Sequence, residues 1–135
     1  MYKNILVPVL FDEKHDTQAS FLAAKALADK DASFHVVHVV ERVPSSVTVA
    51  VSAEIMAEAR MQLEGELKRA SLGLPGAKTA MIEGHAGRAI VDYADANGID
   101  CIVMASHRPD MSNILLGSTA DRVVRHAKCS VHVIR

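Results

Sequence analysis

The chain of 135 residues carries 15 lysines and arginines against 16 aspartates and glutamates, a formal net charge of −1 with the histidines neutral. This balance provides no basic block that would attract a nucleic acid or an anionic membrane, and no apolar run approaches the roughly 18 residues that a membrane span needs. Hydrophobic residues make up 50% of the chain, enough to supply the core of one domain, which we expect to cover residues 1–135.

Two features predict a cytoplasmic location. The apolar stretch at residues 5–9 is short and is not followed by the small-residue cleavage site of a signal peptide. Cys101 and Cys129 stand apart in apolar segments, as the thiols of a reduced protein core do.

The first half of the chain alternates between strand and helix patterns. The β-branched run Asn4 to Val9 predicts a strand, and apolar residues at helical spacing predict a helix over 17–30. The nearly continuous apolar run at 34–40 predicts a strand that is covered on both faces. Residues 53–71 then separate apolar from charged side chains, which predicts an amphipathic helix that packs through its apolar side.

The second half continues this alternation. It predicts a strand over 77–82, a helix over 88–97, a strand over 99–105, a helix over 118–128 and a strand over 130–134. Strict alternation implies an α/β fold with a parallel sheet, right-handed crossovers and helices on both faces. Such sheets bind ligands beyond the carboxyl ends of their strands, so the search for a site narrows to the loops there.

The most informative loop is 106–116, which follows the fourth strand and leads into a helix through Gly117-Ser118-Thr119. The free N–H groups and the positive dipole at the start of a helix can bind an anion. Ser118 and Asp121 also have the spacing of a capping box, although Glu or Gln is preferred at the second position. Spacing alone favours the cap over a phosphate site.

The two ends of the chain resemble one known family. The start Lys3-Asn4-Ile5-Leu6-Val7-Pro8-Val9, the segment Val37-His38-Val39, and residues 115–127 with 129–135 resemble the universal stress proteins over essentially the whole chain. The resemblance implies a doubly wound, five-stranded parallel sheet of order 3-2-1-4-5, like that of the adenine-nucleotide alpha-hydrolases. It also implies homodimers, often paired through their last strands, with tetramers as a larger form.

ATP-binding members of this family carry the pattern G-x2-G-x9-G-[ST] after the fourth strand. Here Ala105 and Arg108 stand at the first two glycine positions, and only eight residues separate Arg108 from Gly117. A Ser-His-Arg-Pro loop of this shorter length is similar to that of a subgroup of bacterial members that bind ATP. His107 and Arg108 therefore remain candidates for the triphosphate loop. The alternatives are a plain loop histidine and an arginine that pairs with Asp110 or with a partner subunit.

When the family's ligand contacts are transferred to the matching positions of this chain, they imply a nucleotide site with a phosphate end and an adenosine end. Ala105 and Arg108 would line the triphosphate loop, and Gly117, Ser118 and Thr119 would hold phosphates. The adenosine would lie against Pro8, Val9 and the backbone of Val39.

Leu10 departs from the family pattern. Many nucleotide-binding members have Asp directly after the Pro-Val of the first strand, facing the adenosine, whereas this chain has Leu10. Asp12 could supply that carboxylate only if the loop bends differently. A lost hydrogen bond to a buried ligand group costs about 1–3 kcal/mol, so we expect weak binding of nucleotides.

Three functions follow from these residues. The leading one is a cytoplasmic, homodimeric module that binds or senses ATP, with Mg²⁺ accompanying the nucleotide. The second is a homodimeric protein-interaction module that has lost nucleotide affinity, and the third is a small phosphatase or nucleotide hydrolase. No catalytic base can be assigned, and the sequence contains neither a Walker A motif nor a G-x-S-x-G elbow. His35 and His38 point to opposite faces of a strand, so they predict no shared metal.

Overall fold

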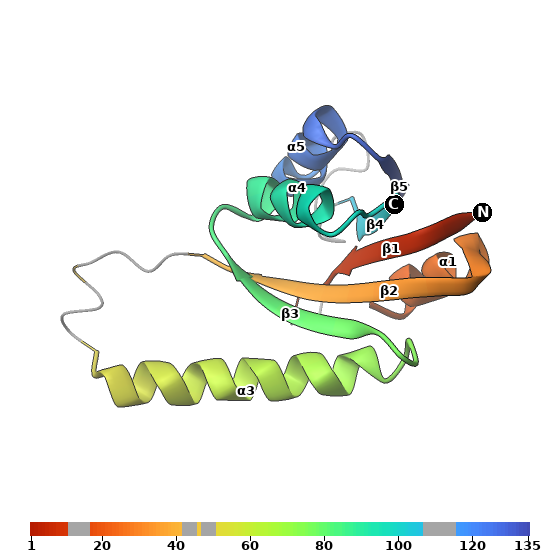
Figure 1. The fold of residues 1–135 in the computed structure, drawn as a ribbon. Coiled ribbons are helices and arrows are strands. Elements are labelled where there is room, and N and C mark those ends of the chain that lie inside the picture. Colours follow the sequence, from red (N-terminus) through yellow and green to blue (C-terminus); the bar gives the residue numbers. More distant parts are fainter. Residues whose placement is uncertain (11–16, 42–45, 47–50, 107–115) are drawn as a thin grey trace.

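The structure, a computed structural model, describes residues 1–10, 17–41, 46, 51–106 and 116–135. Its elements are β1 (Tyr2–Pro8), α1 (Thr17–Leu27), β2 (Ala28–Val40), α3 (Ala53–Ser71), β3 (Lys78–Glu83), α4 (Ala86–Ala96), β4 (Cys101–Ala105), α5 (Ser118–His126) and β5 (Ser130–Ile134). The five strands form one parallel sheet in the order β3-β2-β1-β4-β5 (Figure 1). The fold predicted from the sequence is confirmed.

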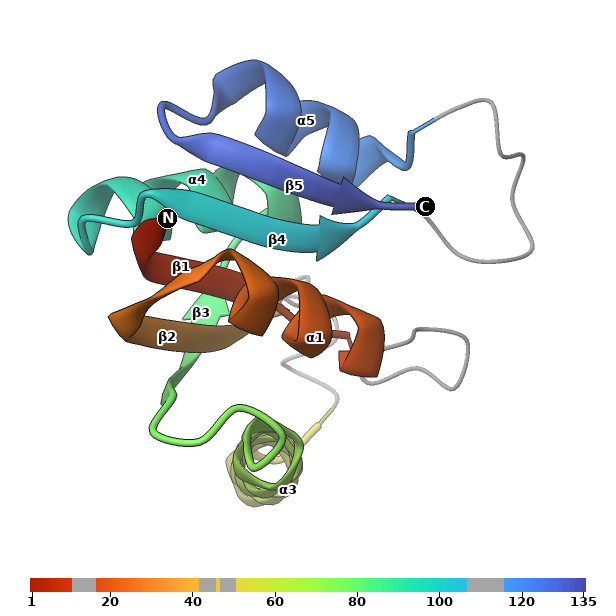
Figure 2. The same ribbon diagram turned by 90° about the vertical axis from the view of Figure 1, so that its right-hand side faces the viewer.

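The sheet has a hydrophobic core on each face, with two helices covering each one. Figures 1 and 2 show α4 and α5 on one side and α1 and α3 on the other. In β1, Ile5 and Val7 pack toward α1 and α3, while Leu6 packs toward α4 and α5. All three side chains are fully buried, as a strand covered on both faces requires.

The boundary between α1 and β2 differs from the sequence-based expectation. The helix predicted over 17–30 ends at Leu27, and β2 starts at Ala28, which pairs with Tyr2. The N-terminal amino group of the chain also forms an ion pair with Asp29. Pairing with β1 therefore decides the conformation of residues 28–30, against the helical preference of alanine and lysine.

The helix α3 packs over only part of its length. Leu67 is its only buried residue, while Ile55 and Met56, which belong to the predicted apolar side, are exposed. A helix of 19 residues is about 28 Å long, whereas the 6 residues of β3 extend over about 20 Å. The first turns of α3 therefore continue past the strand (Figure 1), and the helix packs through only part of its predicted apolar side, at Leu67.

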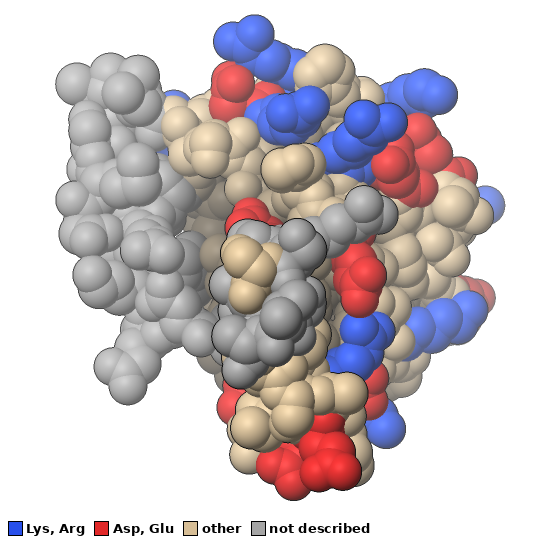
Figure 3. Space-filling model, turned by 90° about the vertical axis from the view of Figure 1, so that its left-hand side faces the viewer, with Lys and Arg blue, Asp and Glu red and all other residues tan. Residues whose placement is uncertain are grey.

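The described surface carries both charges side by side. Figure 3 shows lysines and arginines interspersed with aspartates and glutamates on one face of the molecule. No helix among the described residues is both long and apolar enough to cross a membrane. Cys101 and Cys129 are free thiols, Cys101 being fully buried, and burial raises the pKa of Cys101 to about 11. A buried thiol with this pKa stays protonated near neutral pH, as expected for a core residue.

Candidate functional site

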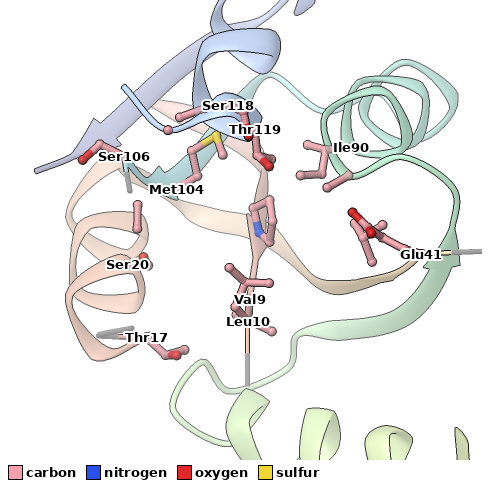
Figure 4. A pocket seen from close by; sticks show the side chains of 16 residues that line it. Val9, Leu10, Thr17, Ser20, Glu41, Ile90, Met104, Ser106, Ser118 and Thr119 are labelled. Carbon is pink, nitrogen blue, oxygen red and sulfur yellow. The ribbon is translucent and has the colours of Figure 1, made fainter. Parts of the chain in front are cut away.

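A pocket of about 400 Å³ opens at the carboxyl edge of the sheet, where β1 lies between β2 and β4. It is lined by Pro8, Val9, Leu10, Thr17, Ser20, Val39, Glu41, Ala86, Ile90, Met104, Ala105, Ser106, Gly117, Ser118, Thr119 and Ala120 (Figure 4). The order of the strands reverses at β1, because β2 follows it on one side and β4 on the other. The pocket thus occupies the crevice at which open α/β sheets bind ligands.

The pocket brings together every predicted site residue that the structure describes. They are Pro8, Val9, Leu10, Val39, Ala105, Gly117, Ser118 and Thr119. His107 and Arg108 lie outside the described residues, as does Asp12. Residues separated by more than 100 positions in the sequence thus meet in one cavity.

Hydrogen bonds to β2 hold Val9 at the base of the pocket. The N–H of Val9 donates to the carbonyl of Val37 at 2.8 Å, which extends the pairing of β1 with β2. The carbonyl of Val9 lies 2.9 Å from Nδ1 of His38. Because a carbonyl oxygen only accepts, Nδ1 of His38 carries the proton in this contact. Both backbone groups of Val9 are thus bound to β2, and its buried side chain forms a rigid apolar part of the wall.

The start of α5 forms another wall of the pocket. The N–H of Gly117 donates to the carbonyl of Ser106 at 2.7 Å, and the N–H of Ser106 donates to the carbonyl of Ile134 at 2.8 Å. These two bonds attach the start of α5 to the ends of β4 and β5. They place the helix N-terminus, with its partial positive charge, beside the carboxyl edge of the sheet.

The capping box predicted for Ser118 and Asp121 is wrong. The N-cap residue is Gly117, with an extended backbone at φ −61° and ψ 155°, and no side chain caps the helix. Ser118 is instead the first helical residue, and Asp121 pairs with Arg125 at 3.1 Å. The first N–H groups of a helix have no partner within the helix. Here they are left without a side-chain acceptor from the cap, beside the hydroxyls of Ser118 and Thr119.

Sequence reasoning missed the part of the wall that comes from helices. Thr17 and Ser20 of α1 and Ile90 of α4 line the pocket (Figure 4). Ser20 is only 5% exposed. Periodicity assigns such residues to a helix but does not say which helices meet at one strand end, so no sequence signal would have selected them. Glu41 could have been found, because it directly follows the second strand.

The chemistry of the pocket is that of a binding site. Its walls are mainly apolar, its hydroxyl groups come from five side chains, and Glu41 is its only charged group within the described part of the chain. The described residues hold no group of three or more His, Cys, Asp or Glu that could bind a metal ion. The arrangement suits a ligand with an apolar, planar part and an anionic end that reaches the start of α5.

A sequence model of the universal stress protein family matches residues 1–135. The chain belongs to this family. Universal stress protein A homolog 2 of Coxiella burnetii is 31% identical to it, over 99% of this chain and 95% of the relative. The family resemblance seen in the sequence is therefore confirmed.

Solved structures of the family have the same fold. Universal stress protein UspA from Lactobacillus plantarum is 32% identical, with a TM-score of 0.73 over 99% of this chain and 98% of its own. The universal stress protein from Archaeoglobus fulgidus, solved in complex with dAMP, is 20% identical, with a TM-score of 0.67 over 99% and 98%. At that identity, the likeness to the second structure establishes the fold alone.

Proposed function

We propose that this protein is a nucleotide-binding or nucleotide-sensing module of the stress response, and that an adenine nucleotide occupies the pocket at the carboxyl edge of its sheet. The observation that supports this proposal best is the convergence of β1, β2, β4 and the start of α5 on one cavity. Its volume of about 400 Å³ lies within the roughly 300–1,000 Å³ of typical small-molecule sites. The dAMP complex of the Archaeoglobus fulgidus relative is consistent with a ligand of this class.

The two ends of the pocket match the two ends of a nucleotide. The apolar side chains of Val9, Val39 and Ile90 suit the faces of an adenine ring, which loses little hydration on burial there. The N–H groups at the start of α5 and the hydroxyls of Ser118 and Thr119 suit phosphate oxygens. The ligand would therefore lie across the tip of β1, with its phosphates on the β4 side.

We propose binding rather than turnover. When ATP is the ligand, Mg²⁺ would arrive on its phosphates, since Glu41 is the only carboxylate that the described residues contribute to the pocket. One carboxylate does not form the paired acidic ligands that many phosphoryl-transfer sites use to hold metal ions. Release of inorganic phosphate from ATP by the purified protein is therefore expected to be at most slightly faster than the spontaneous reaction.

The variant pair Thr119→Asp and Thr119→Asn tests the phosphate end. An acidic residue in the first turn of a helix interacts favourably with the dipole, so Thr119→Asp should fold at least as well as the wild type. Its carboxylate would repel phosphate, and we expect calorimetric titration with ATP or AMP to show affinity reduced by about tenfold or more. Thr119→Asn has the shape of the aspartate variant without its charge, so it should bind more tightly than Thr119→Asp. Equal nucleotide affinity of the two variants would show that the start of α5 does not bind the phosphates.

Leu10 supports a second candidate, a protein-interaction module of the same fold without nucleotide affinity. Its side chain lines the pocket and is 51% exposed, at the position where many nucleotide-binding relatives have a carboxylate. Under this alternative, ATP and AMP, with and without Mg²⁺, would give the wild-type protein neither binding heat nor a rise in melting temperature. A nucleotide that co-purifies with the native protein, found by mass spectrometry, would argue against it.

A further inference from the structure

Glu41 is the one charged side chain that the described residues place in the pocket wall. It directly follows Val40, the last residue of β2, and Figure 4 shows its side chain extending from that strand end toward the space beside Val9, Leu10 and Ile90. Glu41 is exposed, so its carboxylate remains in contact with solvent water. A carboxylate in this position accepts hydrogen bonds and repels anions.

The strand register relates Glu41 to Leu10. In the parallel pairing of β1 with β2, Pro8 lies opposite Val37, and the N–H of Val9 still donates to the carbonyl of Val37. Continuing this register places Leu10 opposite Val39, with Glu41 two residues further along. Residues two apart in an extended chain point to the same side, so the side chains of Val39 and Glu41 share a face. The longer glutamate side chain extends toward the space beside Leu10 (Figure 4), whose own side chain offers no hydrogen-bond acceptor.

The sheet order separates Glu41 from the anion-binding end of the pocket. Glu41 follows β2, the start of α5 adjoins β4, and β1 lies between these two strands. Neighbouring strands are about 4.8 Å apart, so the two ends of the pocket lie roughly 10 Å from each other. A nucleotide with its phosphates at α5 would thus present its sugar and base to Glu41, and the reverse orientation would bring phosphate against a carboxylate.

We infer that Glu41 accepts hydrogen bonds from the ribose hydroxyls of the bound nucleotide, in place of the carboxylate that position 10 lacks. This inference rests on the proposed function. Hydrogen bonds from hydroxyl donors to a charged acceptor are among the stronger ones. Glu41 therefore makes the site selective for ribonucleotides and sets the direction in which they bind.

The inference is tested by comparing AMP with 2′,3′-dideoxy-AMP, which has the same base and phosphate but no ribose hydroxyl for Glu41. Dissociation constants are measured by calorimetry for the wild type, Glu41→Ala and Glu41→Gln. We expect the wild type to bind AMP about tenfold more tightly than the dideoxy nucleotide. Glu41→Ala should bind the two nucleotides equally, because it removes the only acceptor proposed for the hydroxyls.

Glu83→Gln is the matched control. Glu83 is exposed at the end of β3, next to Val40, and its ion pair with Arg60 at 3.1 Å lies outside the pocket wall. It should discriminate between the two nucleotides as the wild type does. Because both glutamates are exposed, neither substitution should prevent folding, and circular dichroism checks this.

Three results would overturn the inference. Glu41→Ala could retain the preference for AMP, in which case another group accepts the hydrogen bonds of the ribose hydroxyls. Glu41→Gln could bind AMP more tightly than the wild type, which would place the phosphates beside Glu41. Wild-type protein that binds neither nucleotide would instead reject the proposed function itself, and the inference with it.

Discussion

His35 is a buried histidine in the second strand, only 6% exposed, on the face that α4 covers. Its Nδ1 lies 2.8 Å from the hydroxyl of Tyr93, and the two rings meet edge to face. Burial, and next the positive charge of Lys78, lower the pKa of His35 below its ordinary value of 6.5. The folded protein therefore favours the neutral imidazole in a polar contact that sequence alone did not suggest.

This lowered pKa predicts an acid-sensitive fold. Below about pH 6.5 the unfolded chain binds a proton at His35 that the folded chain resists, so the free energy of unfolding should decrease as the pH falls toward the folded-state pKa. Urea denaturation at pH 7.5 and pH 5.5 measures the decrease. In His35→Gln, which has no titrating group there, the decrease should be smaller.

At the scale of elements, Gly87 allows α4 and α5 to pack closely. It is buried in the first turn of α4, and a Cβ atom placed on it would lie 2.9 Å from Cβ of Arg122. Carbon atoms do not approach so closely without a shift of one helix. The absence of a side chain at Gly87 thus keeps the starts of both helices at the pocket.

Two glycine substitutions measure this packing. Gly87→Ala should lower the free energy of unfolding by about 1–2 kcal/mol, because the clash with Arg122 outweighs the better helix propensity of alanine. The matched variant is Gly65→Ala in the middle of α3, where the nearest atom to the added Cβ is Nη1 of Arg69 at 3.6 Å. It should raise stability by about 0.5–1 kcal/mol. Destabilisation of similar size in both variants would contradict the packing argument.

At the scale of the whole molecule, β5 is an edge strand with one side open. The N–H of Ser130 donates to the carbonyl of Asp100, and the carbonyl of Ile134 accepts from Ser106. Every second residue of β5 therefore bonds toward β4, which leaves the backbone groups of Val131 and Val133 directed outward. Such an edge is a template for pairing with another chain.

We expect two copies to pair through this edge and form the homodimer that the family resemblance implies. Light scattering should then give twice the monomer mass of 14.5 kDa. Val133→Pro removes an outward N–H without breaking the bonds to β4, so it should yield a folded monomer, whereas Val133→Ala should remain a dimer. A monomeric wild type, or a dimeric Val133→Pro variant, would exclude β5 as the interface.

Local patterns in the sequence predicted most of the secondary structure. The helix over 53–71 and the strand over 130–134 have the predicted bounds, and the alternation of elements led to the correct fold class. The errors occur where distant segments compete with local preference. Residues 28–30 join β2 because Tyr2 pairs with Ala28, and Ser118 follows the N-cap because hydrogen bonds fix Gly117 at the strand ends.

The sequence by itself determined the periodicity of each element, the parallel sheet and the family, since these depend on residues close together in the chain or on matched segments. Only the tertiary structure decided which side chains share the pocket. Ser20, Glu41 and Ile90 belong to separate elements, and they meet because β1 lies between β2 and β4 with helices packed on both faces. The physical reason is that a binding site consists of contacts between distant segments, and the order of the strands sets those contacts.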